Sequence, residues 1–140
     1  MERLGSDLEI VSLVRDDQPT GYLSNVYTAT VKQSDEELHL FIKAAHEDKQ
    51  RAEFVTDSGM DKIELSFYRD ILPSLIKFEE EKTGQSVLTT MFPKFYAGDT
   101  GDFYLILENV CHRGFKLEDC NKGLNEDQAD LMVKQVSNND

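Results

Sequence analysis

The first third of the chain alternates between apolar and polar positions, which is the period typical of β-strands. Residues 8–14 (LEIVSLV) and 22–31 (YLSNVYTATV) are rich in β-branched and aromatic side chains, and the turn-forming stretch 16–21 (DDQPTG) separates them. A second polar break at residues 33–36 leads into residues 37–45 (ELHLFIKAA). This pattern predicts three consecutive antiparallel strands.

From Met60 onward the apolar residues recur at spacings of three and four, which predicts an amphipathic helix. The inward face of this helix is expected to carry six apolar residues, namely Ile63, Phe67, Tyr68, Ile71, Leu72 and Leu75. Pro73 lies near the end of the pattern. Because proline has no amide hydrogen, we expect the helix to end or kink there.

The rest of the chain contains two short strands and a final helix. The polar stretch 77–87 (KFEEEKTGQSV) precedes the apolar segments 93–98 and 103–108, which a turn of Asp and Gly residues joins. The pattern of residues 124–136 (LNEDQADLMVKQV) then predicts a helix, with Asn125 as its N-cap and acidic residues in its first turn. Five strands and two helices together indicate an α+β fold.

The charge of the chain limits its partners. The 140 residues, enough for one domain of ordinary size, include 27 Asp and Glu against 15 Lys and Arg, a net charge of -12. Such a charge disfavours binding to nucleic acid or anionic lipid. No apolar run approaches the roughly 20 residues of a membrane helix, and the N-terminus does not resemble a signal peptide. We therefore expect a cytoplasmic protein with no nucleic-acid or membrane partner.

The cysteines and histidines do not form a metal-binding pattern. Cys111 and Cys120 fit neither a CxxC motif nor a dense disulfide framework, so free thiols are expected. His39, His46 and His112 are scattered singly along the chain. We expect no metal ligands among these residues.

One charged residue, Lys43, ends the apolar segment 38–43 (LHLFIK). Glu64 lies at the edge of the inward face of the predicted helix, where it can project toward the sheet and pair with this lysine. In phosphoryl-transfer enzymes such a pair positions an ammonium group against the nucleotide phosphates. The alternative is that Lys43 ends an edge strand, where lysine discourages aggregation, and that Glu64 is one of many surface carboxylates.

The order of the predicted elements is that of the N-terminal lobe of a protein-kinase-like fold. Six segments carry a closer resemblance: SNVYTATV (24–31), LFIK (40–43), IELSFYRDILPSL (63–75), FPKFYAGD (92–99), YLILENV (104–110) and RGFKLEDCNKGLN (113–125). On these segments the chain resembles the ecdysteroid kinase-like family, also called CHK kinase-like. The members of this family are small-molecule kinases related to choline and aminoglycoside phosphotransferases.

The resemblance implies an α+β fold of the protein-kinase type. Residues 1–108 are expected to form the N-terminal, nucleotide-binding lobe, with a five-stranded antiparallel sheet and a C-helix. Residues 109–140 are expected to form the hinge and the first helix of a truncated C-terminal lobe. ATP is the implied cofactor, and a small molecule with a hydroxyl group, of the ecdysteroid class, is the implied acceptor.

The resemblance also assigns roles to individual residues. Lys43 resembles the phosphate-binding lysine and Glu64 its helix partner, while Glu108 and the residues up to Val110 match the hinge that contacts adenine through its main chain. The nucleotide loop, which includes Gly21 and Ser24, corresponds to residues 19–24 (PTGYLS). Only Gly21 is flexible there, so a plain hairpin turn is the alternative for this loop.

Phe41 shares a strand face with Lys43, where it either crowds the space of an adenine ring or offers it a stacking surface.

Phosphoryl transfer also needs an aspartate at the acceptor hydroxyl and Asp or Asn ligands for Mg²⁺, which this fold places in the C-terminal lobe. After Asn125 the sequence contains no H-x-D motif followed by Asn and no D-F segment. We therefore expect no catalytic or metal-binding residue in these 140 residues, and the Mg²⁺ ligands in the missing lobe. The chain is expected to be the inactive ATP-binding lobe of a small-molecule kinase. The alternative is a truncated, non-catalytic binding or regulatory module.

Overall fold

The computed structural model describes residues 8–16, 23–116 and 122–137, the last three of these without their side chains. Two of the residues discussed above, Gly21 and Cys120, lie outside this part of the chain. The chain divides into two compact units, Met1–Val110 and Cys111–Asp140. Each unit is described by itself.

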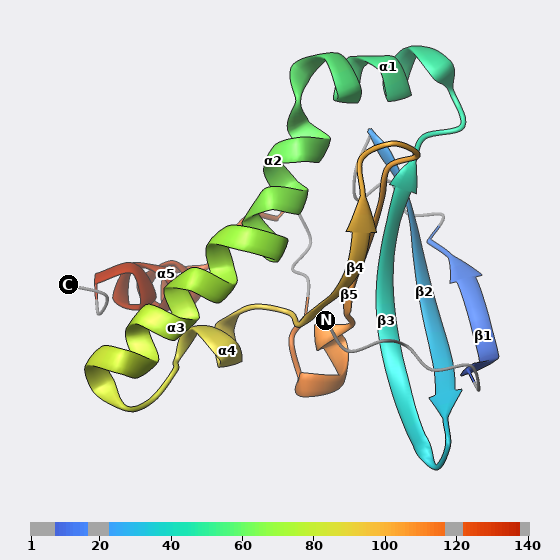
Figure 1. The fold of residues 1–140 in the computed structure, drawn as a ribbon. Coiled ribbons are helices and arrows are strands. Elements are labelled where there is room, and N and C mark those ends of the chain that lie inside the picture. The colour runs from blue at the N-terminus through green and yellow to red at the C-terminus, as the bar shows by residue number, and fades with distance from the viewer. Residues whose placement is uncertain (1–7, 17–22, 117–121, 138–140) are drawn as a thin grey trace. The chain divides into compact units, whose positions relative to one another are not determined.

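The first unit contains one antiparallel sheet of five strands (Figure 1). The five predicted strands are confirmed as β1 (Leu8–Arg15), β2 (Ser24–Gln33), β3 (Glu36–Ala45), β4 (Phe95–Asp99) and β5 (Tyr104–Glu108). Their order across the sheet is β1-β2-β3-β5-β4. Because β3 is the central strand, the alternative that Lys43 ends an edge strand is wrong.

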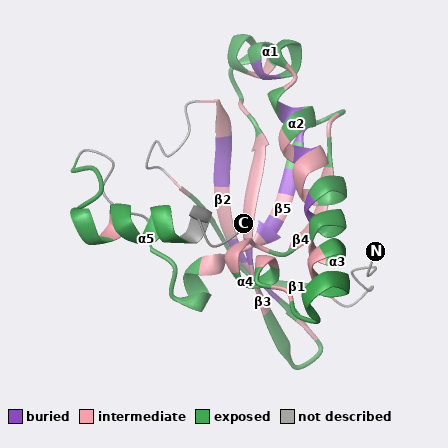
Figure 2. Cartoon of the chain, turned by 90° about the vertical axis from the view of Figure 1, so that its left-hand side faces the viewer, coloured by how far each residue is buried: buried purple, intermediate pink, exposed green. Residues whose placement is uncertain are grey.

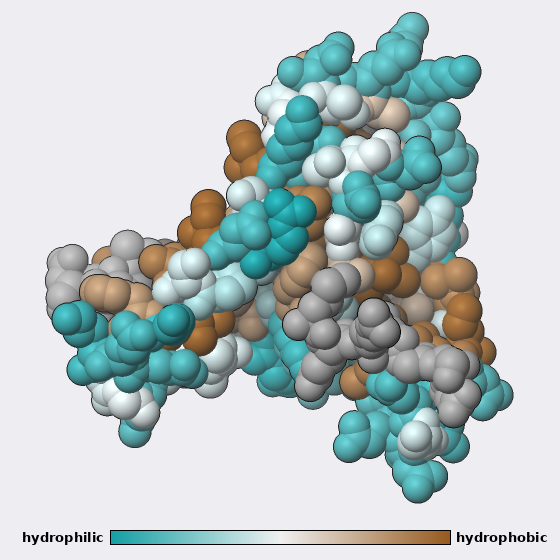
Figure 3. Space-filling view, in the orientation of Figure 1, coloured by the Kyte–Doolittle hydropathy of each residue, from teal (hydrophilic) through white to brown (hydrophobic). Residues whose placement is uncertain are grey.

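Strand β1 is an edge strand with an apolar surface, visible as hydrophobic area over β1 in Figure 3. Four of its large apolar side chains are more than half exposed, namely Ile10, Val11, Leu13 and Val14. The register of β1 with β2 shifts between Ile10 and Ser12, which marks a bulge. A bulge bends an edge strand and hinders its pairing with another chain. The bulge is therefore expected to hinder pairing of this apolar edge with another chain.

Helical segments connect β3 to β4 and follow β5. They are α1 (Lys49–Ser58), α2 (Met60–Ser66), a π-helical turn (Phe67–Ile71), α3 (Leu72–Thr83), α4 (Leu88–Met91), a 3₁₀ turn (Val110–Arg113) and α5 (Glu126–Ser137). The sequence pattern missed α1, although Asp48 is a strong N-cap whose side chain accepts the N–H groups of Gln50 and Arg51. Gly59, with a φ of 72°, ends α1 and begins α2.

The helix does not end at Pro73, so that part of the prediction is wrong. The π-helical turn and α3 follow α2 without a break, and Figure 1 shows them as one continuous coil. The N–H of Leu72 donates to the carbonyl of Phe67, five residues back. We attribute this wider turn to the proline, because its ring clashes with the carbonyl four residues earlier in a regular α-helix. Residues 77–83, expected in a polar connection, belong to α3 instead.

Helix α2 packs on one face of the sheet and forms the main core. Leu65, with 2% of its surface exposed, packs with three buried residues of the β4–β5 hairpin, namely Phe103, Leu105 and Leu107. Figure 2 shows these buried residues concentrated in α2 and β5, whereas α3 is largely exposed. A second cluster, Ala29, Val31 and Leu40, belongs to β2 and β3.

The predicted inward face of the helix is only partly correct. Leu72 is buried, but Ile63 is 69% exposed, and Leu65, which the pattern did not single out, is the residue on the sheet. A π-helical turn adds a residue to the helical turn, so positions before and after it no longer share one α-helical face. A pattern read at constant period therefore misplaces one half of the helix.

In the second unit, α5 confirms the predicted final helix. Asn125 accepts the N–H of Gln128 through its side chain, and the Gln128 side chain accepts the N–H of Asn125. This reciprocal capping confirms Asn125 as the N-cap. Cys111 is exposed and forms no disulfide.

Two leucines of α3 give a matched test of the packing of this helix. Leu72 is 4% exposed and Leu75 is 46% exposed. Leu72→Ala is expected to lower the free energy of unfolding by about 2 to 5 kcal/mol, because it leaves a cavity. Leu75→Ala is expected to cost less than about 1 kcal/mol. Urea unfolding followed by circular dichroism measures both, and equal losses would contradict the assigned face.

Candidate functional site

The structure brings Lys43 of β3 and Glu64 of α2 together. The Nζ atom of Lys43 donates to both carboxylate oxygens of Glu64 at 2.8 Å. The two side chains are 26% and 33% exposed, so the pair is partly buried. The predicted pairing is confirmed, although the two residues are 21 positions apart in the sequence.

The packing around Lys43 orients its charge. Lys43 lies directly between Val26 of β2 and Leu105 of β5 in the register of the sheet, and both neighbours are buried. Apolar neighbours cover the aliphatic stem of a lysine while its ammonium group reaches a polar partner. An ammonium group has three N–H donors, so at least one remains for an anion when Glu64 occupies two.

Tyr68 follows Glu64 by one helical turn, and the charge of Glu64 affects the pKa of its hydroxyl. Burial of its side chain raises the pKa of the Tyr68 hydroxyl, and the negative charge of Glu64 raises this pKa further. The ring of Tyr68 packs against the Leu65 core and lies edge-on to Phe67, with the ring centres 5.2 Å apart. The sequence pattern assigned Tyr68 only to the core, whereas the structure also places it next to the candidate site.

The face of the sheet that carries Lys43 continues toward the end of β5. Phe41 lies two residues before Lys43, pairs with Leu107 and is half-buried. Glu108 pairs with Leu40, three residues from Lys43, which is roughly 10 Å along a strand. Phe41 thus forms a half-buried apolar surface between the lysine and the predicted hinge, next to the buried Leu107.

The predicted hinge is tied to the sheet by its backbone. The N–H of Glu108 donates to the carbonyl of Lys94 at 2.8 Å, and the Glu108 side chain accepts the N–H of Lys94 at 3.1 Å. The N–H of Asn109 donates to the carbonyl of His39 at 2.8 Å. These two N–H groups are therefore engaged in the fold, and Val110, which begins the 3₁₀ turn, is the next position along the chain.

The two predicted residues of the nucleotide loop are only partly placed. Ser24 begins β2, opposite Ala45, two residues before Val26 and thus on the same face as Lys43. Gly21 lies outside the described residues. Ser24 therefore lies on the same face of the sheet as Lys43, while the roles of both Ser24 and Gly21 in nucleotide binding stay predictions.

Sequence reasoning missed a buried carboxylate, Asp61, which lies one turn before Glu64 on α2. Its Oδ1 atom accepts the N–H of Lys62 at 2.8 Å, and its Oδ2 atom has no hydrogen-bond partner among the described residues. A negative charge is favourable in the first turn of a helix, where N–H groups are free. This placement offsets part of the cost of burying the group.

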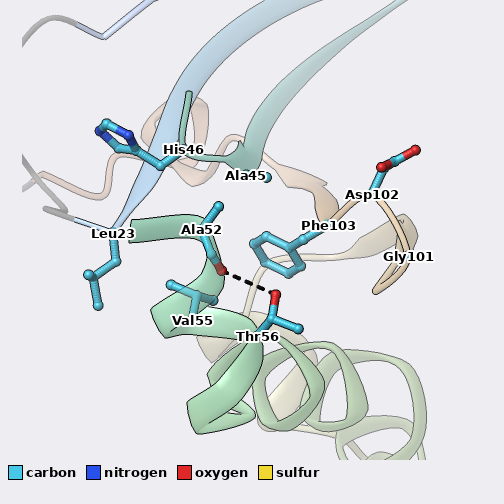
Figure 4. A pocket seen from close by; sticks show the side chains of 9 residues that line it. All are labelled: Leu23, Ala45, His46, Ala52, Val55, Thr56, Gly101, Asp102 and Phe103. Carbon is cyan, nitrogen blue, oxygen red and sulfur yellow. Dashed lines mark hydrogen bonds between the residues drawn. The ribbon is translucent and has the colours of Figure 1, made fainter. Parts of the chain in front are cut away.

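A small cavity of about 190 Å³ lies at the end of the sheet, between α1 and the turn that joins β4 to β5 (Figure 4). Its lining does not include Lys43 or Glu64. Thr56 donates its hydroxyl to the carbonyl of Ala52, and the Nδ1 atom of His46 accepts the N–H of Asp48. These polar groups are already used within the segment around α1, so the cavity offers mainly apolar contacts.

Neither a metal cluster nor a membrane helix is found in the part of the chain that the structure describes. No three His, Cys, Asp or Glu side chains gather there in a way that could hold a metal ion. Likewise, none of the helices described is both long and apolar enough to cross a bilayer.

A five-stranded antiparallel sheet with a helix whose glutamate holds a lysine of the central strand is compatible with the N-terminal lobe of a kinase-like fold. The model of the ecdysteroid kinase-like family matches residues 18–138. The chain therefore belongs to the ecdysteroid kinase-like family, and membership implies ATP, a divalent metal and a small-molecule substrate in general terms. No curated protein and no solved structure matches the chain.

The pKa of Tyr68 reports on the charge of Glu64. Glu64→Gln is expected to lower this pKa, because it removes the negative charge, but to leave it above its ordinary value, because burial is the larger cause. NMR titration with ¹³C-labelled tyrosine measures the shift, with Tyr68→Phe to assign the signal. An unchanged Tyr68 pKa in Glu64→Gln would show that the two groups do not interact.

Proposed function

We propose that residues 1–108 are the nucleotide-binding lobe of a small-molecule kinase, in which α2 and α3 serve as the C-helix. Residues 109–140 would supply the hinge and the first helix of a C-terminal lobe. The ion pair between Lys43 and Glu64, across 21 residues of sequence, is the observation that carries this proposal. Family membership over residues 18–138 supports it independently.

In this proposal Lys43 binds the phosphates of ATP. Glu64 holds the ammonium group in place from one side, so its remaining donor is directed to an anion without a search among rotamers. A fixed positive charge beside the phosphates also stabilises the negative charge that develops during transfer. Ser24, at the start of β2 on the same face, and Gly21 would complete the phosphate-binding end of the site.

The adenine ring would lie against Phe41, which is half-buried and offers a flat face for stacking beside the buried Leu107. Since the N–H groups of Glu108 and Asn109 are engaged in the fold, the donor to adenine falls to Val110. The carbonyl of Glu108 is the acceptor that the hinge assignment predicts. Both contacts use the main chain, so they place few demands on the side chains.

The proposed reaction is phosphoryl transfer to a hydroxyl group of a small molecule, with ecdysteroids as the acceptor class suggested by the family. ATP supplies the phosphoryl group when it is bound. The residues of this chain bind and orient the nucleotide. The aspartate at the acceptor hydroxyl and the Mg²⁺ ligands are not assigned to any of the 140 residues, so binding and turnover are separate properties here. A cytoplasmic location suits both the cofactor and the exposed Cys111, which forms no disulfide.

Binding of ATP with Mg²⁺, measured by isothermal titration calorimetry, tests the role of Lys43. Lys43→Ala is expected to weaken binding by about tenfold or more, because a charge-assisted hydrogen bond worth about 1.5 to 3 kcal/mol is lost. Lys32→Ala, which removes an exposed lysine of β2, is the matched control and should leave the affinity unchanged.

Equal affinities of the Lys43→Ala variant and the parent chain would contradict the proposed phosphate contact. Absence of any ATP binding by the parent chain would remove the nucleotide-lobe function and favour a non-catalytic regulatory module. Glu64→Gln is expected to weaken ATP binding less than Lys43→Ala, because the ammonium group remains but is no longer held.

The 140 residues alone are expected to bind ATP without turning it over. ATP hydrolysis and phosphoryl transfer, followed as release of labelled phosphate and as labelled acceptor, should not exceed the Lys43→Ala background. Turnover by the parent chain above that background would show that a catalytic group is present among these residues.

A further inference from the structure

Four residues lie side by side across the sheet, one on each of β2, β3, β5 and β4. The register joins Val26 to Lys43, Lys43 to Leu105, and Leu105 to Gly98. Directly opposed residues project from the same face of a sheet. This face is the one that meets α2, since Lys43 bonds Glu64.

Helix α2 meets this cross-strand row with two consecutive residues. Glu64 holds Lys43 at 2.8 Å, while Leu65 packs into the core with Leu105. Neighbouring residues of one helix are rigidly connected through its backbone hydrogen bonds. A displacement of Leu65 away from the sheet therefore also moves Glu64 away from Lys43.

Gly98 provides the space that Leu65 occupies. A Cβ atom at position 98 would lie 2.6 Å from the Cδ1 atom of Leu65 and 3.1 Å from the carbonyl oxygen of Tyr104. Gly98 is not among the glycines with positive φ, so its backbone conformation is open to other residues. Glycine is required at this position because the helix approaches closely, with the Tyr104 carbonyl adding to the crowding from within the sheet.

Leu65 has little room to avoid such a Cβ atom by rotating its side chain. It is 2% exposed and belongs to a buried cluster with Phe103, Leu105 and Leu107, against which Tyr68 and Phe95 pack. Protein cores are close-packed, so a side chain displaced in one direction meets other atoms. The response expected of the structure is a movement of α2 away from β4 and β5.

We propose that Gly98 and Leu65 are positioning residues for Lys43. The missing side chain at position 98 lets α2 approach the sheet closely enough for Glu64 to hold the ammonium group. This inference deepens the proposed function and rests on it for its consequence in nucleotide binding. The geometric part concerns only the ion pair, so it can be tested without any nucleotide.

The test measures how fast Lys43 is acetylated by acetic anhydride, with peptide mass spectrometry as the readout. An amine held by a carboxylate has to leave that partner before it can react. Gly98→Ala is expected to raise the acetylation rate of Lys43 by about three- to fivefold, the effect of losing an ion pair of moderate strength. Lys32 is exposed and serves as the internal reference, whose rate should not change.

Two further variants separate the positioning role from a general loss of stability. Gly101→Ala changes a glycine of the same hairpin whose Cβ atom would meet only Asp99, at an ordinary 3.6 Å, and it should leave Lys43 protected. Gly98→Ala combined with Leu65→Val removes the Cδ1 atom that the new Cβ atom would meet. This double variant is expected to restore the slow acetylation of Lys43.

An unchanged Lys43 rate in folded Gly98→Ala, or a fast rate in the double variant, would overturn the inference. If Gly98→Ala alone does not fold, the double variant is compared with Leu65→Val, and Lys43 must be equally protected in both. The proposed function fails separately, when the parent chain does not bind ATP. Where ATP does bind, Gly98→Ala should weaken the affinity by about the same factor as it raises the acetylation rate.

Discussion

The contact between α2 and the β4–β5 hairpin is the constraint on which the rest of the structure depends. Leu105 and Leu65 are almost fully buried, and burial of one leucine side chain contributes about 1.5 to 3 kcal/mol. This contact sets the distance between α2 and the sheet. The charged groups beside it, Lys43 and Glu64, then meet at hydrogen-bonding distance. The ion pair is therefore a consequence of apolar packing. It contributes little to the stability of the contact, since partly exposed ion pairs are weak.

The continuous helix formed by α2, the π-helical turn and α3 contacts two different parts of the molecule, one before the π-helical turn and one after it. Before this turn the helix packs on the sheet through Leu65; after it, Glu79 of α3 binds the segment that leads to β4. The Glu79 carboxylate accepts the N–H of Leu88 and the hydroxyl of Ser86, and these bonds lower the pKa of Glu79. The helix thus joins the site to the connection that returns the chain to the sheet.

An anion site in a chain with a net charge of -12 has to rely on local donors. The ion pair is neutral as a whole, so in the proposed site Lys43 would attract a phosphate mainly through a positioned N–H group at short range. In the proposed site, the ring of Phe41 and the main chain near Val110 would contribute contacts that do not depend on charge. A negative net charge disfavours non-specific binding to polyanions, but it is compatible with a site built from such directed contacts.

The sequence by itself determined the five strands, the final helix with its Asn125 cap, and the two charged residues of the candidate site. These features depend on local alternation, on capping groups and on residue type, which are properties of short segments. Tertiary structure decided which side of the long helix faces the sheet, because the wide turn before Pro73 changes the helical phase. It also decided that α2 approaches the sheet at Gly98. A sequence pattern contains no information on the distance between two segments. The 2.6 Å between a Cβ atom at position 98 and the Cδ1 atom of Leu65 is defined only once the helix lies on the sheet.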